Sequence, residues 1–86
     1  FKFNTNRAFG AVNNDVVNLQ KFLNVLGFTV ASKGLGSMDN EIKRFGPATV
    51  SALAKFQKAY GIKPSVGYFG PITRLKVNEL IKSLGL

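Results

Sequence analysis

The stretch of sequence that decides the fold occurs twice, as Phe45-Gly46-Pro47-Ala48-Thr49 and, 24 residues later, as Phe69-Gly70-Pro71-Ile72-Thr73. Proline is favoured at the first position of a helix, because the N–H that it lacks would have no partner there. Apolar residues at helical spacing follow each copy, and then a glycine, which readily takes the left-handed conformation that closes a helix. The sequence therefore predicts two similar helices, over about 47–60 and 71–84.

An earlier stretch predicts a third helix over about 14–26. Its apolar residues recur at helical spacing: Val16, Leu19, Leu23 and Leu26. Asn14 is a suitable N-cap, and the negative charge of Asp15 suits the positive end of the helix dipole. The helix is expected to end at Leu26-Gly27-Phe28, and in all three helices the apolar residue after the glycine is expected to fold back on the last turn.

These patterns predict an all-α protein, a compact three-helix bundle with an internal helix repeat. A long Gly- and Ser-rich surface loop, 29–44, is expected between the first two helices, and a tight turn, 63–68, between the last two. The stretch 28–30 has the composition of a short extended segment. We expect a single domain over 1–86.

The size and composition fit one small core. The chain has 86 residues, of which 45% are hydrophobic, with eight Phe and no Cys. Scaling of surface with mass predicts a folded surface of about 5,000 Å². Since neither a disulfide nor a Cys/His zinc site is available, packing of this core must stabilise the domain.

The composition also argues against catalysis. Without His or Cys, the chain lacks the imidazole and thiolate groups of most nucleophilic and transition-metal sites. Its four carboxylates are Asp15, Asp39, Glu41 and Glu79. Asp39 and Glu41 are close in sequence, but the loop around them is not expected to hold a catalytic pair rigidly. We therefore predict no enzyme activity, no catalytic residue, no metal site and no cofactor.

The charge points to an anionic partner. Twelve Lys and Arg against four Asp and Glu give a net charge of +8 and a pI near 10.2. The basic residues are spread from Lys2 to Lys82, and Lys43-Arg44 is their longest run, which indicates diffuse attraction. No apolar run is long enough to cross a membrane. We interpret Phe1, which follows no initiator Met or signal-peptide pattern, as the cut end of a mature secreted protein or of an excised module.

The sequence resembles the three-helix peptidoglycan-binding domain, a module attached to bacterial cell-wall hydrolases and other envelope proteins. The resemblance rests on the stretches 15–23, 26–28, 45–49, 52–53, 56–57 and 61–62, on Gly67, and on 70–73, in this order, and covers roughly residues 9–80. The chain departs from the family pattern in its longer 29–44 loop. It also carries Lys76 where the third helix normally has a small residue, and Ser65-Val66-Gly67 where the family often has Asp-Gly.

This resemblance implies a non-catalytic module that anchors or targets an attached protein to the bacterial cell wall, through the glycan strand and stem peptide of peptidoglycan. It implies an extracellular or envelope location within a larger protein. We expect the module to be monomeric, without membrane insertion, and we expect carbohydrate binding rather than nucleic-acid binding.

Four residues are candidates for ligand contact. Tyr60 and Tyr68 each offer an apolar ring face to a sugar and a hydroxyl to a polar group, although Tyr60 also has a core position in its helix. Arg44 and Arg74 border the two repeated helix starts, where each could pair with a carboxylate of a stem peptide near a helix N-terminus. Ordinary solvated surface charge is the structural alternative for both arginines.

The other polar residues of the motifs have structural interpretations. Gln20 and Gln57 follow Leu19 and Phe56 at the border of the buried face, where we predict that they hydrogen-bond backbone between helices. The Gly-Pro-x-Thr elements are predicted to build helix starts, with the threonine hydroxyl serving a local role at the N-terminus.

Two other functions are compatible with the sequence. A basic three-helix nucleic-acid-binding domain is suggested by the net charge and by Arg74, Asn78 and Lys82, which share one face of the last helix. A pro-segment or spacer is suggested by the related helical pro-region of matrix metalloproteases. That inhibitory mechanism needs a zinc-binding cysteine, which this chain lacks.

Overall fold

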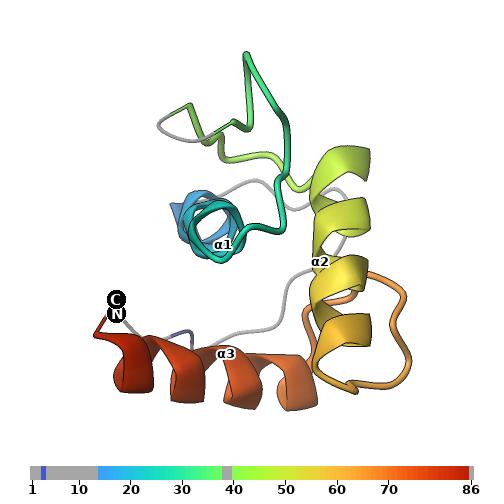
Figure 1. Ribbon diagram of the computed structural model, residues 1–86. Coiled ribbons are helices and arrows are strands. Elements are labelled where there is room, and N and C mark those ends of the chain that lie inside the picture. The colour runs from blue at the N-terminus through green and yellow to red at the C-terminus, as the bar shows by residue number, and fades with distance from the viewer. Residues whose placement is uncertain (1–2, 4–13, 38–39, 86) are drawn as a thin grey trace.

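The computed structural model describes residues 3, 14–37 and 40–85 of the chain. It contains three helices, α1 (Asn14–Val25), α2 (Pro47–Ala59) and α3 (Pro71–Leu84), and α1, seen nearly end-on in Figure 1, lies in the angle between α2 and α3. The described residues form no strand, which confirms the all-α prediction. Residues 28–30, where the sequence predicts a short extended segment, pair with no strand, and the N–H of Val30 donates to the side chain of Asn24.

Helices α2 and α3 each begin at the predicted proline. Gly46 and Gly70 are extended N-caps, with φ of −102° and −95°, and a proline opens each helix. The first helical hydrogen bonds run from Val50 N to Gly46 O at 3.1 Å and from Arg74 N to Gly70 O at 2.8 Å. The internal repeat is therefore a repeat of backbone geometry.

The helices also end at the glycines that the sequence predicts. Gly27, Gly61 and Gly85 all have positive φ, of 89°, 68° and 71°. Phe28 N donates to Leu23 O at 2.9 Å, and Ile62 N donates to Gln57 O at 2.8 Å, the long backward bond of a Schellman ending. Helices α1 and α2 stop one residue earlier than predicted, because Leu26 and Tyr60 already belong to these turns. The corresponding contact of Leu86 lies outside the described residues.

Phenylalanine rings fill the centre of the core. Phe45, Phe56 and Phe69 are fully buried. Phe22 and Phe28 meet Phe56 edge-on, at centroid distances of 5.5 and 5.6 Å, so that Phe28 closes α1 against the neighbouring helix α2. The total accessible surface of 5070 Å² agrees with the value expected for one compact domain of this mass.

The 29–44 loop is tied to α1 by one buried side chain. Asn24 Nδ2 donates to the carbonyl of Gly36 and to the carboxylate of Glu41, both at 3.0 Å, and Asn24 Oδ1 accepts the N–H of Val30 at 2.9 Å. Leu35, near the tip, is 77% exposed. The predicted surface loop is thus exposed at its tip and anchored at its base. Asp39 lies outside the described residues.

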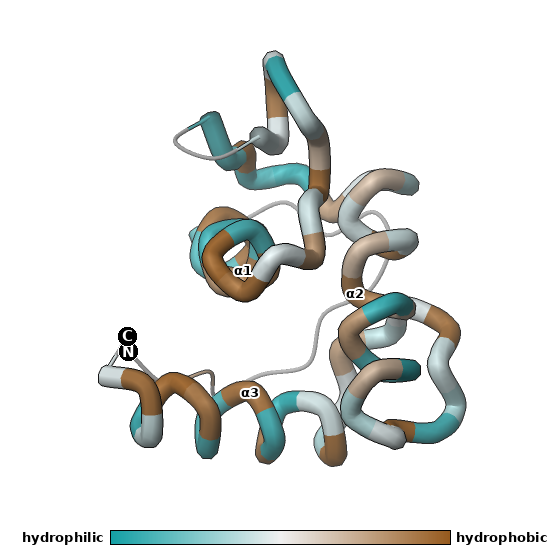
Figure 2. Tube along the Cα trace, in the orientation of Figure 1, coloured by the Kyte–Doolittle hydropathy of each residue, from teal (hydrophilic) through white to brown (hydrophobic). Residues whose placement is uncertain are grey.

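Helix α3 mixes apolar and hydrophilic residues along its whole length, seen as brown and teal bands in Figure 2. None of the described helices combines the length and the apolar character that crossing a membrane requires. In the described part of the chain, His, Cys, Asp and Glu residues do not gather in groups that could hold a metal ion.

Candidate binding groove

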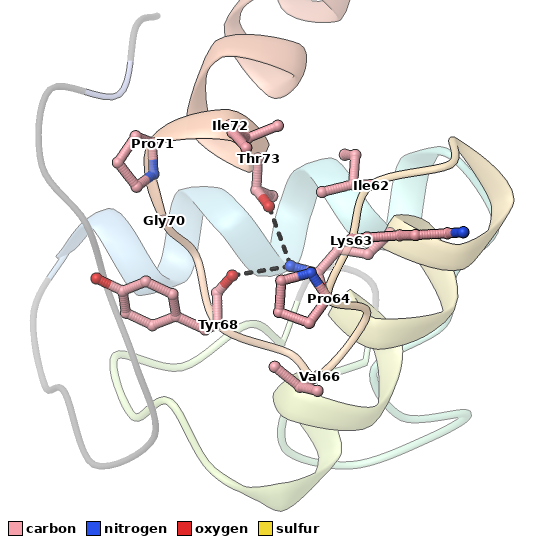
Figure 3. A pocket seen from close by; sticks show the side chains of 10 residues that line it. Ile62, Lys63, Pro64, Val66, Tyr68, Gly70, Pro71, Ile72 and Thr73 are labelled. Carbon is pink, nitrogen blue, oxygen red and sulfur yellow. Dashed lines mark hydrogen bonds between the residues drawn. The ribbon is translucent and has the colours of Figure 1, made fainter.

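The start of α3 is fixed to α2 by the side chain of Gln57. Gln57 Nε2 donates to the carbonyl of Tyr68 at 2.8 Å and to Thr73 Oγ1 at 3.0 Å, as the dashed lines in Figure 3 show. Gln57 Oε1 accepts the N–H of Gly67 at 2.8 Å. This confirms the structural role predicted for Gln57, and it holds the connection between the two helices in one position.

Gln20 does the same for the start of α2. Its Nε2 donates to the carbonyl of Arg44 at 3.1 Å and to Thr49 Oγ1 at 2.8 Å, and its Oε1 accepts the N–H of Ile42 at 2.8 Å. The role predicted for Gln20 is thus confirmed as well. The role predicted for the threonines needs correction, since neither helix start has a side-chain cap, and both hydroxyls accept a bond from the preceding helix.

Gly67 allows the connection to pass very close to α2. Its φ is +83°, and a Cβ placed there would lie 2.6 Å from both Val50 Cγ1 and the carbonyl oxygen of Val50. A contact of this kind is available to glycine alone. The predicted turn at 63–68 therefore lies directly on α2, which brings its apolar residues beside the start of α3.

An apolar hollow of about 230 Å³ lies between this connection and the start of α3. Pro64, Val66 and Tyr68 line it from the connection, and Pro71 and Ile72 from the beginning of α3 (Figure 3). The Gln57 amide and the Thr73 hydroxyl, both almost fully buried, lie at its base. Since these polar atoms already bond to each other, the hollow presents mainly carbon atoms.

A second, charged hollow of about 450 Å³ adjoins the first. It is lined by Tyr60, Lys63, Leu75, Lys76 and Glu79. The two hollows share residues 62, 63 and 72, so they lie side by side on the surface of α2 and α3. We call the two hollows together the α2–α3 groove.

Exposed apolar side chains concentrate around this groove. The large hydrophobic residues exposed in the described part of the chain are Val25, Leu35, Tyr60, Val66, Tyr68, Ile72, Leu75 and Leu84, and five of these eight line the groove. Ile72 and Leu75 are 64% and 72% exposed. A rimmed apolar patch of this kind is typical of a ligand- or partner-binding surface.

Tyr60 connects the core to the charged hollow. Its ring packs on Phe56 at a centroid distance of 4.7 Å, yet 40% of the residue is exposed. Lys76 Nζ lies 5.8 Å from the centre of the ring and 3.3 Å from Glu79 Oε1. Tyr60 thus packs on the core and also lines the charged hollow, with the surface ion pair of Lys76 and Glu79 beside it.

The structure separates the four predicted contact residues. Tyr60 and Tyr68 line the two hollows of the groove, whereas Arg44 and Arg74 line neither. The nucleic-acid alternative rests on a face of α3 formed by Arg74, Asn78 and Lys82. The side chain of Asn78 is engaged in this structure, because it is hydrogen-bonded to the backbone of Phe3. Asn78 Oδ1 accepts the Phe3 N–H at 2.7 Å, and Asn78 Nδ2 donates to the Phe3 carbonyl at 2.8 Å.

Several residues of the groove were not predicted from the sequence, among them Lys63, Val66, Ile72 and Leu75. The repeat contains a signal that could have identified two of them. Ile72 and Leu75 correspond, at the 24-residue offset, to Ala48 and Ser51 of α2. Exposed apolar side chains in one copy, at positions that are small or polar in the other, indicate a role beyond the shared framework.

The described residues form a small helical fold with an exposed apolar groove beside the start of α3. The chain belongs to the family described as "Putative peptidoglycan binding domain", whose family model matches residues 12–76. This confirms the family that the motifs resemble, and it associates the chain with the cell wall. Comparison with curated proteins and with solved structures found no match.

Proposed function

We propose that this domain is a non-catalytic module that binds peptidoglycan and holds the protein to which it belongs at the bacterial envelope. The observation that carries the proposal is the family match over residues 12–76. The α2–α3 groove supports it, because it offers exposed apolar side chains and two half-exposed tyrosines, Tyr60 and Tyr68. We propose these two residues as ligand contacts.

The net charge of +8 supports the same function in a less specific way. A wall rich in carboxylates attracts a basic module, which raises its local concentration without selecting a ligand. In this scheme Arg44 and Arg74, which lie outside the groove, contribute to the diffuse attraction. A shallow groove gives modest affinity for one repeating unit, and attachment to a larger protein increases residence at the wall through effective concentration.

Co-sedimentation with purified insoluble sacculi tests the proposal. The domain is expected to pellet with the sacculi at physiological salt, and a substantial fraction is expected to remain bound when higher salt has screened the diffuse attraction. A basic protein of similar size and charge serves as the control. Equal pelleting of the control, or complete release of the domain by salt, would contradict specific wall binding.

A further inference from the structure

We propose that the α2–α3 groove is the subsite for the stem peptide of peptidoglycan and not for its glycan strand. The inference rests on the proposed wall-binding function and adds which chemical part of the wall is recognised. In this arrangement the apolar hollow takes methyl-bearing alanine residues, and the charged hollow takes the amino and carboxyl groups of the peptide.

The first argument is that the buried polar side chains at the base of the apolar hollow, Gln57 and Thr73, are already engaged with each other and with the backbone. Both hydrogens of Gln57 Nε2 are used, on the Tyr68 carbonyl and on Thr73 Oγ1, and Gln57 Oε1 accepts the Gly67 N–H. The residues Gln57 and Thr73 are only 1% and 3% exposed. In the described part of the chain, buried side-chain nitrogens and oxygens all have partners.

A sugar ring fits such a hollow poorly. It carries hydroxyl or amide groups around most of its circumference, and burying these without partners is unfavourable. The Tyr68 hydroxyl is directed away from Pro64 and Val66 in Figure 3, so it does not supply the missing donor inside the hollow. An alanine methyl group needs no hydrogen-bonding partner, and its burial is favourable.

The second argument is the presence of both charge signs in the adjoining hollow. Lys76 Nζ is held between Glu79 Oε1 at 3.3 Å and the Tyr60 ring at 5.8 Å, and Lys63 lines the same hollow. A stem peptide carries carboxylates, which lysine ammonium groups attract, and a diamino-acid residue whose ammonium group a glutamate attracts. A glycan strand without peptide carries no ammonium group to pair with Glu79.

The third argument is that the two hollows share lining residues, and that two residues of the groove are not needed to build the helix start. Residues 62, 63 and 72 line both hollows, so one extended ligand can span them. The helix start itself does not require Ile72 and Leu75, since Ala48 and Ser51 occupy the equivalent positions in α2. Their apolar side chains are therefore free to serve recognition.

The test compares intact sacculi with sacculi from which an amidase has removed the stem peptides, and adds titration with a soluble stem tetrapeptide. We expect amidase treatment to lower binding about tenfold, the equivalent of about 1.4 kcal/mol. In the titration, the largest NMR shifts are expected at Val66, Ile72 and Lys76. If the domain binds amidase-treated sacculi as strongly as intact sacculi, the stem-peptide proposal is overturned and the proposed function still stands.

Variants locate the site. The double variant Ile72→Ala, Leu75→Ser, which copies the residues of the first repeat, is expected to bind the tetrapeptide about tenfold more weakly. Leu35→Ser, an equally exposed leucine outside the groove, is the matched control. Lys76→Gln should weaken binding more than Lys82→Gln, which removes the same charge from the same helix outside both hollows.

The outcomes separate the two proposals. Amidase-sensitive binding that the groove variants do not weaken would place the stem peptide elsewhere and overturn the assignment of the groove. Absence of binding to intact sacculi by the folded wild-type domain would overturn the proposed function itself. Circular dichroism of each variant identifies any loss of binding that comes from unfolding.

Discussion

The two repeated helix starts have the same internal construction and different surfaces. At the start of α2, Gln20 Nε2 reaches Thr49 Oγ1 at 2.8 Å, and at the start of α3, Gln57 Nε2 reaches Thr73 Oγ1 at 3.0 Å. In both, the same amide also binds the backbone carbonyl five residues before the threonine. Outside, the start of α2 carries Ala48 and Ser51, whereas the start of α3 carries Ile72 and Leu75.

This difference separates the residues that build the domain from those that we propose bind the ligand. The glutamine, the threonine and the Gly-Pro pair recur because they solve one problem, the fixing of a helix start to the preceding helix. Exposed side chains do not contribute to that solution, so they are free to differ. The following predictions test this separation, beginning with the largest effect.

Loss of either glutamine is expected to have the largest effect. Gln57→Leu leaves the Gly67 N–H, the Tyr68 carbonyl and the Thr73 hydroxyl without partners, which should lower the free energy of unfolding by about 4 kcal/mol. The comparison predicts a loss for Gln20→Leu within about 1 kcal/mol of that value. Urea unfolding followed by circular dichroism measures both.

Since a domain of this length has a total stability of only about 4–13 kcal/mol, the leucine variants can fail to fold. Thr49→Val and Thr73→Val are milder tests of the same clamps, each removing one acceptor at an expected cost of about 1–2 kcal/mol. A loss at one threonine only would contradict the equivalence of the two helix starts.

Gly67→Ala breaks a feature that only the second start possesses. At this offset the first repeat has Lys43, which shows that the close approach to Val50 is not part of the shared framework. Positive φ and contact with the Val50 carbonyl together should cost about 3 kcal/mol of unfolding free energy. Gly61→Ala is the control. Gly61 has φ of +68°, but a Cβ added there would meet no atom within 4 Å apart from the adjoining residues, so this substitution should cost only about 1–2 kcal/mol of unfolding free energy.

The contact between Phe3 and α3 is predicted to have an intermediate effect. Asn78→Ala removes two hydrogen bonds to the Phe3 backbone, which should lower the unfolding free energy by about 1–2 kcal/mol. Faster amide exchange of Phe3, with little change in α2, is the expected signature. Unchanged exchange at Phe3 would show that its edge-on packing on Phe69, at 4.9 Å, is sufficient to hold it.

The exposed groove residues are expected to have the smallest effect on stability. Ile72→Ala with Leu75→Ser should change the free energy of unfolding by no more than about 0.5 kcal/mol, since both side chains are mostly exposed. Thermal unfolding beside the wild-type domain provides the measurement. A loss above about 2 kcal/mol would mean that these residues belong to the framework, which would remove the basis for assigning them to recognition.

Much of the fold could be predicted because its signals are local. Pro47 and Pro71 mark helix starts, and Gly27 and Gly61 mark helix ends, through the conformations that these residues alone prefer. Gln20 and Gln57 were predictable from their position at the border of an apolar helix face. Local backbone preference and helical spacing need no knowledge of distant residues, which explains why the family could be identified from the motifs.

The candidate site depended on contacts that no local pattern reveals. That Val66, Ile72, Leu75 and Lys76 border one groove follows from the position of the 63–68 connection on α2, which Gly67 and Gln57 fix. The sequence by itself thus determined three helices, their glycine ends, an apolar core and the family. Only the tertiary structure decided that Tyr60 and Tyr68 line one groove while Arg44 and Arg74 lie outside it, because a binding surface is formed by residues that packing brings together from separate elements.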